Sequence, residues 1–268
     1  MKNQYKILKL LGLLLLASPL YLSWLPSWVV VNHLPVEVQN VSGLYFDALF
    51  VAFKELSITL VATIVFAMIL SVLFGYVSVW SMTFGRGLSN VLNVIESVPS
   101  ILIALFMYVP VSGFLASHHS GVSSFMSLFV FILAATLTIL PESVRSITIP
   151  LADLYNRKYS ISFRSYGFPK GRILAVLMRT DLVRNALNRV AAGILLKTLV
   201  LDCSFGFILQ LGYGANGTPA HQSPGALIAT YRSALMGQYP QFFFWVPTAM
   251  LVMINIAFLI VLNDVKEE

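Results

Sequence analysis

Charged side chains are scarce in this sequence. Asp, Glu, Lys and Arg make up 10% of the 268 residues, whereas 58% of the residues are hydrophobic. Soluble domains carry roughly 25% charged residues and about 45–50% apolar ones. A soluble chain with this composition would expose more apolar surface than it could cover. The composition therefore excludes an ordinary soluble domain and favours an all-α integral membrane protein.

Cysteine and the common catalytic motifs are also lacking. The only cysteine is Cys203, so no disulfide can form within the chain and no cysteine metal site is possible. The sequence contains no G-x-x-x-x-G-K-[ST], G-x-S-x-G, H-E-x-x-H or C-x-x-C motif. We expect the four histidines, His33, His118, His119 and His221, to be solvated loop residues. The sequence thus predicts no metal or cofactor in this chain and no enzyme, although a site built from scattered intramembrane residues stays open.

Long charge-free runs are what the sequence has instead. Residues 10–36, 56–85, 97–141 and 233–263 contain no Asp, Glu, Lys or Arg. A membrane-spanning helix needs about 20 apolar residues, so 97–141 is long enough for two spans. The sequence predicts about six spans, at 10–31, 57–80, 97–114, 123–141, 188–212 and 241–263. The first is interpreted as an uncleaved anchor, with a cleaved signal peptide as the alternative. Residues 46–60 are interpreted as an amphipathic helix at the membrane interface.

Basic residues are concentrated between two of these spans. Nine Lys and Arg lie between Arg145 and Arg189, opposed only by Asp153 and Asp181, and the N-terminus adds three lysines. The positive-inside rule places both termini and residues 142–187 in the cytoplasm. We expect this cluster to contact lipid headgroups. It lacks the aromatic spacing of a nucleic-acid site, so no nucleic-acid partner is predicted.

Ionisable residues within the spans are the main candidates for functional groups, because a charge in the bilayer is costly. Asp202 is expected to turn toward the bundle interior or a solute path, as a structural hydrogen-bonding group or as part of that path. Lys197, in the same span, is expected to extend toward the cytoplasm. Glu142 is expected at a cytoplasmic span end, paired with Arg145 at i, i+3. Pro99 falls in the first turns of the third span, where a proline is tolerated.

Several segments resemble one family, the dipeptide/oligopeptide/nickel class of binding-protein-dependent ABC transporter permeases, and within it the shorter of the two permeases. "ESVPSILIALFM" (96–107) looks like the family's acidic-x-x-Ser-Ile-Pro element at the start of its third span. "LDCSFGFILQLGYG" (201–214) looks like its Glu-Ala-Ser-Leu-Ser-Phe-Leu-Gly-Leu-Gly, with Asp202 in place of the glutamate. Residues 223–264 resemble its closing segment, and the resemblance covers about residues 50–268.

The family's Glu-Ala-Ala-x-x-x-Gly motif, which docks on the ATPase, is degenerate here. The matching residues are Ile161 to Gly167, and only the glycine is retained. The loop keeps its size, charge and glycine turn, so a coupling segment within 142–187 is still expected. The residues assigned to ATPase coupling are Ser162, Phe163, Arg164, Gly167, Pro169 and Gly171, and those assigned to the translocation path or bundle interior are Pro99 and Asp202.

The resemblance implies the permease subunit of an ATP-driven importer in the bacterial cytoplasmic (inner) membrane. Residues 1–45 would be an anchor helix with an external loop, and residues 46–268 the permease core. The implied partners are a homologous second permease, two ATPase subunits that hold ATP and Mg, and an extracytoplasmic solute-binding protein that docks near 212–240. Peptides or a metal chelate would be the solute. An ion-coupled secondary transporter that uses Asp202 and a non-transporting membrane scaffold are the alternatives.

Overall fold

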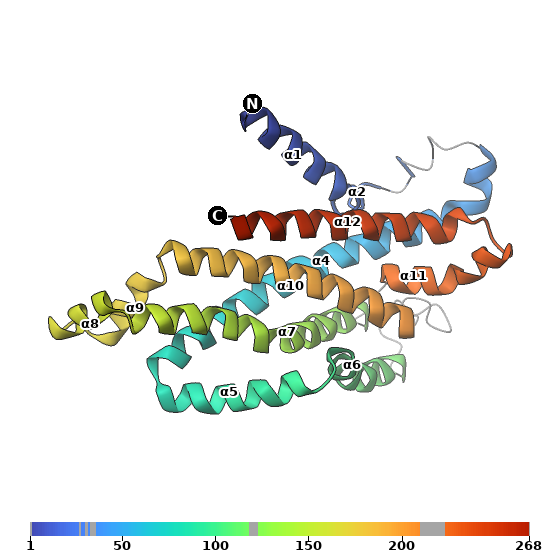
Figure 1. The fold of residues 1–268 in the computed structure, drawn as a ribbon. Helices are drawn as coiled ribbons and strands as arrows, with labels where there is room; N and C mark the ends of the chain where they lie inside the picture. The colour runs from blue at the N-terminus through green and yellow to red at the C-terminus, as the bar shows by residue number, and fades with distance from the viewer. Residues whose placement is uncertain are drawn as a thin grey trace.

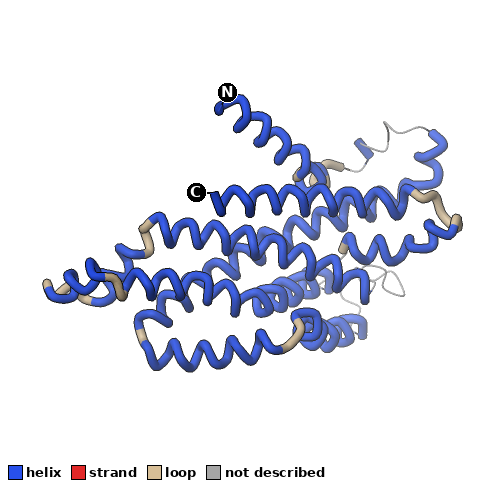
Figure 2. Tube along the Cα trace, viewed as in Figure 1, coloured by secondary structure: helices blue, strands red, loops and turns tan. Residues whose placement is uncertain are grey.

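The computed structural model describes residues 2–26, 28–29, 32, 36–117, 123–209 and 223–267. Within these ranges every regular element is a helix and no strand occurs (Figures 1 and 2). The elements are α1 (Lys2–Leu16), α2 (Ser18–Leu22), α4 (Val36–Trp80), α5 (Met82–Ser97), α6 (Ser100–Ser117), α7 (Ser123–Tyr155), α8 (Lys158–Ser165), α9 (Lys170–Leu177), α10 (Asp181–Leu209), α11 (Pro224–Thr230), the 3-10 helix η1 (Tyr231–Met236) and α12 (Phe242–Glu267). All four histidines lie outside the described residues.

Four helices are long and apolar enough to cross a membrane, and a bent pair makes a fifth candidate. The four are Tyr45–Trp80, Ser127–Tyr155, Asp181–Ile208 and Phe242–Asn263. The bent pair joins Met82–Ser97 to Ser100–Pro110 at an angle of 88°. These helices are those of a multi-pass membrane protein, with four or five spanning candidates among the described residues rather than the six predicted.

The N-terminal segment accounts for one span of the difference, and the predicted span 97–114 is present only as the second part of the bent pair. The predicted span 10–31 is not one helix, because α1 ends at Leu16, α2 covers five residues, and residues 23–26 are not helical. The 15 residues of α1 extend only about 22 Å, less than the roughly 30 Å of the hydrocarbon core. Pro19 at the start of α2 has no N–H for a helix bond, which favours a new helix at this point.

The helix α4 is longer than predicted and contains no separate interface helix. Residues 46–60 continue directly into the predicted second span within one 45-residue helix. Phe46, Leu49 and Phe53 are buried, where they pack in a cluster with Phe243 and Ile254 of α12. The apolar face that suggested a helix lying at the membrane interface therefore forms part of the protein core.

The helix α7 also passes the predicted end of its span. It contains Pro141 and Pro150 and ends only at Tyr155. A proline removes one helix bond, but neighbouring helices allow the helix to continue through such a position in a membrane bundle. The first part of the predicted cytoplasmic segment 142–187 is therefore the end of α7, its last part belongs to α10, and only residues 156–180 form a separate element.

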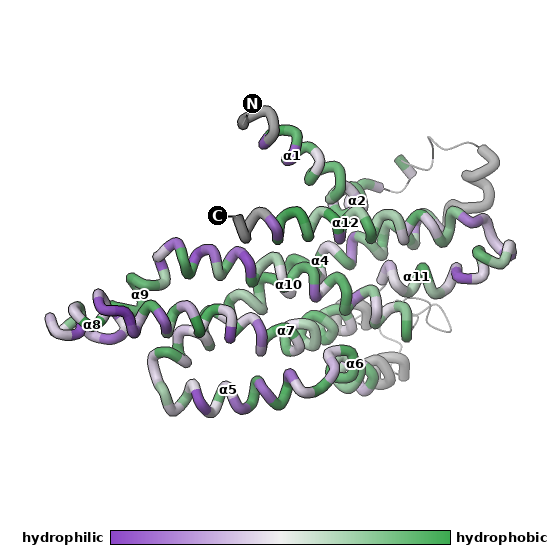
Figure 3. Tube along the Cα trace, viewed as in Figure 1, coloured by the Kyte–Doolittle hydropathy of each residue, from purple (hydrophilic) through white to green (hydrophobic). Residues whose placement is uncertain are grey.

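Figure 1 shows α4, α7, α10 and α12 running along a common direction, with α8 and α9 at one end and α11 at the other. The free ends of α1 and α12 point toward the end that carries α8 and α9. In Figure 3 hydrophilic residues gather on α8 and on the adjoining parts of α7 and α10, whereas α12 is mostly hydrophobic.

Candidate functional site

A helical hairpin formed by α8 and α9 projects from the end of the bundle. All residues from 161 to 169 are exposed. Tyr166 is 82% exposed, and Ile161, Phe163 and Phe168 are each more than a third exposed. Arg164 and Arg172 lie among them, the latter with its guanidinium 5.3 Å from the centre of the Phe168 ring. Aromatic and arginine side chains are the types most often found at the centre of protein interfaces.

The hairpin is fixed to the end of α4 by polar contacts. Lys170 Nζ donates to the carbonyl oxygen of Trp80, the last residue of α4, at 2.6 Å. A lysine in this position offsets the negative end of the helix dipole and satisfies a terminal carbonyl. Tyr76 Oη donates to the carbonyl oxygen of Gly171 at 3.1 Å. A Cβ on Gly171 would lie 3.0 Å from the Trp80 ring, so a glycine allows this close approach.

A second set of contacts ties the hairpin to α7. Arg164 Nη2 donates to the carbonyl oxygen of Tyr155 at 3.0 Å, and its guanidinium lies 4.5 Å from the centre of the Tyr155 ring. The buried Ser160 hydroxyl donates to the carbonyl oxygen of Leu154 at 2.8 Å. Beneath these bonds Leu154 packs with Ile173 and Leu174 of α9 in a buried cluster. The hairpin is therefore attached to the ends of both α4 and α7 by hydrogen bonds and apolar packing.

The turn between α8 and α9 depends on a glycine with a positive φ. Gly167 has φ 82°, a conformation that side-chain-bearing residues rarely adopt. Its N–H bonds to the Arg164 carbonyl and the Phe168 N–H bonds to the Phe163 carbonyl, which is the Schellman arrangement at a helix end. Pro169 then precedes α9 in an extended conformation.

The structure brings the six predicted coupling residues together in this one hairpin. Ser162, Phe163 and Arg164 lie on α8, Gly167 forms the turn, Pro169 precedes α9, and Gly171 lies in its first turn. Gly171 differs from the others, because it packs inward against Trp80 rather than lying on the surface. The predicted docking region near 212–240 lies partly outside the described residues, which resume at Ser223.

Asp202 and Pro99 lie far along the chain from this hairpin and in different surroundings. Asp202 is 1% exposed and lies where α11 packs on α10, and its carbonyl oxygen accepts a hydrogen bond from Ser223 Oγ at 2.9 Å. Pro99 is exposed and occupies the bend between α5 and α6. The preceding Val98 is extended, as expected for a residue before proline.

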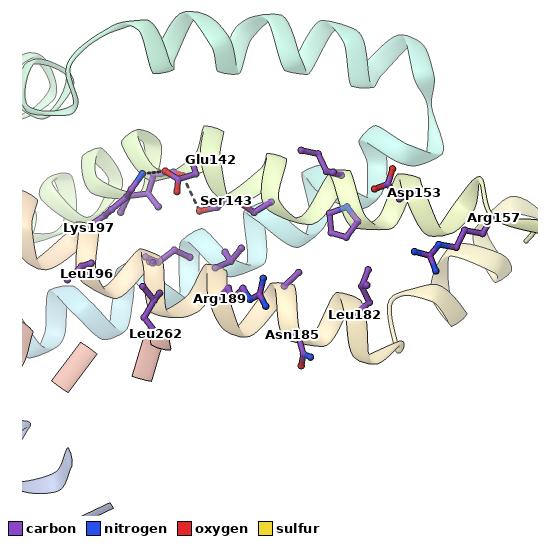
Figure 4. A pocket seen from close by; sticks show the side chains of 18 residues that line it. Glu142, Ser143, Asp153, Arg157, Leu182, Asn185, Arg189, Leu196, Lys197 and Leu262 are labelled. Atoms are coloured by element: carbon purple, nitrogen blue, oxygen red, sulfur yellow. Dashed lines mark hydrogen bonds and ion pairs between the residues drawn. The ribbon is translucent and has the colours of Figure 1, made fainter. Parts of the chain in front are cut away.

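A groove between α7 and α10 is a second region of interest, and the sequence did not reveal it. It has a volume of about 820 Å³ and is lined by residues such as Ser146, Arg157, Asn185 and Arg189 (Figure 4). Glu142 of α7 and Lys197 of α10 form an ion pair within it. A second cavity of about 330 Å³ adjoins the first, and the two share Ile139, Leu196 and Lys197 in their lining.

The ion pairs differ from those expected. Glu142 pairs with Lys197 rather than with Arg145. Arg145 Nη2 instead donates to Glu96 Oε2 and to Asn93 Oδ1 of α5, both at 2.8 Å. The two pairs therefore link three helices, and a pattern within α7 alone could not have identified either of them.

Comparison with known proteins does not assign the chain to a family. No protein-family model matches the sequence, and no curated protein is significantly similar to it. Within the described residues no group of three or more His, Cys, Asp or Glu side chains is placed to hold a metal ion. What can be inferred about the chain therefore depends on the hairpin and the groove.

Proposed function

We propose that the chain is the permease subunit of an ATP-driven importer, with the α8–α9 hairpin as its docking element for a separate ATPase. The observation that supports this is the combination of an exposed tip with a firmly held base. Residues 161–169 are exposed, while Lys170 and Arg164 bond to the ends of α4 and α7. Such a hairpin can receive a displacement from another protein and pass it to the spanning helices.

The remaining partners follow from the same proposal. A homologous second permease would pair with this chain to form the path of the solute, a peptide or a metal chelate. An extracytoplasmic binding protein would deliver that solute at the end of the bundle that carries α11. ATP and Mg would be bound by the two ATPase subunits, and the basic residues near the hairpin would contact lipid headgroups of the bacterial inner membrane, where both termini would be cytoplasmic.

Co-purification from native membranes tests the proposal. The tagged full-length chain is extracted in mild detergent, and co-purifying chains are identified by mass spectrometry. We expect an ATPase chain with a G-x-x-x-x-G-K-[ST] motif and a second multi-pass chain. Replacing Phe163 and Tyr166 together by Ala should lower recovery of the ATPase at least about tenfold, because interface aromatics often contribute about 2 kcal/mol each.

A matched control is available at the opposite end of the bundle. Tyr239 is 49% exposed and precedes α12, so Tyr239→Ala removes a similar side chain far from the hairpin. Recovery of the ATPase should stay unchanged in this variant. Equal recovery with the double hairpin variant would show that the hairpin is not the docking element. Solute uptake by the purified chain alone, without ATP, would refute the proposal as a whole.

A further inference from the structure

The groove between α7 and α10 contains charged side chains at the level of the apolar part of the bundle, where contact with lipid chains would be unfavourable. Glu142 is 61% exposed and Lys197 is 48% exposed by side chain. Lys197 lies 16 residues from the start of α10, which places it about 24 Å along the helix, well beyond the reach of its own side chain to the cytoplasmic end. The expected extension of Lys197 toward the cytoplasm is replaced by a bond to Glu142.

Neighbouring helices fix that depth independently. Ile194, one turn before Lys197, packs with Ala67, which lies near the middle of the charge-free run 56–85 of α4. Leu199, just after Lys197, packs with Ile254 of α12, inside the charge-free run 233–263. The Glu142–Lys197 pair therefore lies within the apolar layer of the bundle and not at its edge.

Exposed charged side chains at this depth must contact water or another polypeptide instead of lipid chains. Transfer of one charged side chain to the centre of a bilayer costs at least about 2.5 kcal/mol, so such groups normally face a bundle interior or a water-filled cavity. The groove itself continues the polar lining toward the hairpin, through Ser146, Asn185 and Arg189. On the other side of the pair the lining of the smaller cavity includes Ser100, Thr138 and Ser204.

The ion pair marks the boundary between these two cavities. Thr138, Glu142 and Ser146 follow one another at intervals of four residues, so they share one face of α7. Thr138 lines only the smaller cavity, Glu142 and Ser146 line only the larger one, and Lys197 lines both. The bond from Lys197 to Glu142 thus joins α10 to α7 beside the point where the two cavities meet, and Figure 4 shows this bond between the two helices.

We propose that the two cavities are halves of one solute passage, and that Glu142 and Lys197 close it and set its charge selectivity. This rests on the proposed function, because it assigns the path of the solute to one face of the permease. A solute can pass only when the pair separates. When the pair separates, a charged solute group can bind Glu142 or Lys197. Charged solutes are therefore selected over neutral ones, and the charge sign that the passage prefers depends on both residues.

Thiol labelling in native membranes tests this without a known solute. In a Cys203→Ala background, Ser146→Cys and Thr138→Cys report on the two sides of the pair, about 12 Å apart along α7. The probes are a cationic and an anionic methanethiosulfonate of similar size, applied from the cytoplasmic side. We expect fast labelling of Ser146→Cys and slow labelling of Thr138→Cys while the pair is intact.

Reversing one charge of the pair should open the passage and should also make it favour reagents of one charge sign. Lys197→Glu leaves two carboxylates and should speed labelling of Thr138→Cys by the cationic reagent about tenfold relative to the anionic one, the factor expected from one charge-assisted contact. Glu142→Lys should reverse this preference. The double variant Glu142→Lys/Lys197→Glu should restore slow labelling, and unchanged labelling of Ser146→Cys by a neutral methanethiosulfonate checks that each variant folds.

Arg86 of α5 serves as the control, because it is an exposed charge that lines neither cavity. Arg86→Gln should leave the labelling of Thr138→Cys unchanged. A Ser146→Cys variant that reacts from neither side would overturn the proposal, as would single reversals that leave the rates and the preference of the reagents unaltered. ATPase recovery is measured separately, so a failure here is distinguishable from a failure of the proposed function.

Discussion

Replacing Gly225 by Ala should force α11 away from its packing position on α10. A Cβ at this position would lie 1.9 Å from the carbonyl oxygen and 2.7 Å from the carbonyl carbon of Cys203, both backbone atoms of α10. No side chain can rotate to relieve that contact. Ordinary contact begins at 3.4 Å, so α11 must withdraw by about 1.5 Å, the difference between 3.4 and 1.9 Å.

The magnitude follows from what α11 contributes to the core. Leu227 of α11 is 2% exposed in the cluster that includes α4 and α12. Forcing an extra methyl group into a packed core typically costs about 1–3 kcal/mol. Stretching the bond from Ser223 Oγ to the Asp202 carbonyl adds about 1 kcal/mol. We expect Gly225→Ala to lower the free energy of unfolding by about 3 kcal/mol.

The assay is equilibrium unfolding of the purified chain in mixed micelles, as the fraction of sodium dodecyl sulfate is raised and tryptophan fluorescence is followed. Gly193→Ala is the control, since a Cβ on this α10 glycine has nothing within 4 Å. That variant should gain up to about 1 kcal/mol from helix propensity. The reasoning is refuted if Gly225→Ala unfolds at the same detergent fraction as the wild-type chain.

Three further predictions concern local stability. Lys170→Ala removes the bond to the Trp80 carbonyl, so amide hydrogen exchange in α9 should become about fivefold faster, as expected for about 1 kcal/mol. Gly167→Val forces a β-branched residue into φ 82° and should destabilise the hairpin by at least about 1 kcal/mol, seen as faster tryptic cleavage at Arg164 and Lys170. Tyr45→Phe removes the buried bond to the Phe243 carbonyl and should lower the unfolding free energy by about 1 kcal/mol.

Each of these variants has a control elsewhere in the chain. Lys158→Ala tests a lysine of α8 for which no such cap is present, and its exchange pattern in α9 should match wild type. Gly87→Ala, which meets nothing within 4 Å, should leave cleavage at the hairpin unchanged. Tyr21→Phe removes a comparable bond, to the Leu14 carbonyl, at an exposed site and should have little effect on unfolding. A hairpin that resists trypsin equally in Gly167→Val would contradict the strain assigned to this turn.

The helical class and most spanning helices could be predicted because charge-free runs of about 20 residues have few stable alternatives in a bilayer. Their ends could not be predicted equally well. Pro141 is a plausible helix end in sequence, yet α7 continues to Tyr155, because packing against neighbouring helices compensates for one missing backbone bond. Residues 10–31 look like one span, but a separate short helix, α2, begins at Ser18 with Pro19 in its first turn.

The candidate site was only half visible in the sequence. The hairpin residues, from Ser162 to Gly171, lie within ten positions of one another, and it was the resemblance to a coupling motif, with its glycine at Gly167, that grouped them. The ion pair was not visible, because Glu142 and Lys197 are 55 residues apart and meet only through the packing of α7 on α10. Helical spacing within α7 favoured Arg145 as the partner, but that arginine is held by Glu96 from a third helix.

The length of α7 has a mechanical consequence. Its 33 residues form a lever arm about 50 Å long that begins near α6 and ends at the base of the hairpin. A tilt of about 10° around its midpoint would carry each end some 4 Å in opposite directions, by the rise of 1.5 Å per residue. Pro141, where one backbone bond is missing, lies close to that midpoint and directly before Glu142. A bend of α7 at Pro141 would therefore move the neighbouring Glu142 carboxylate relative to Lys197.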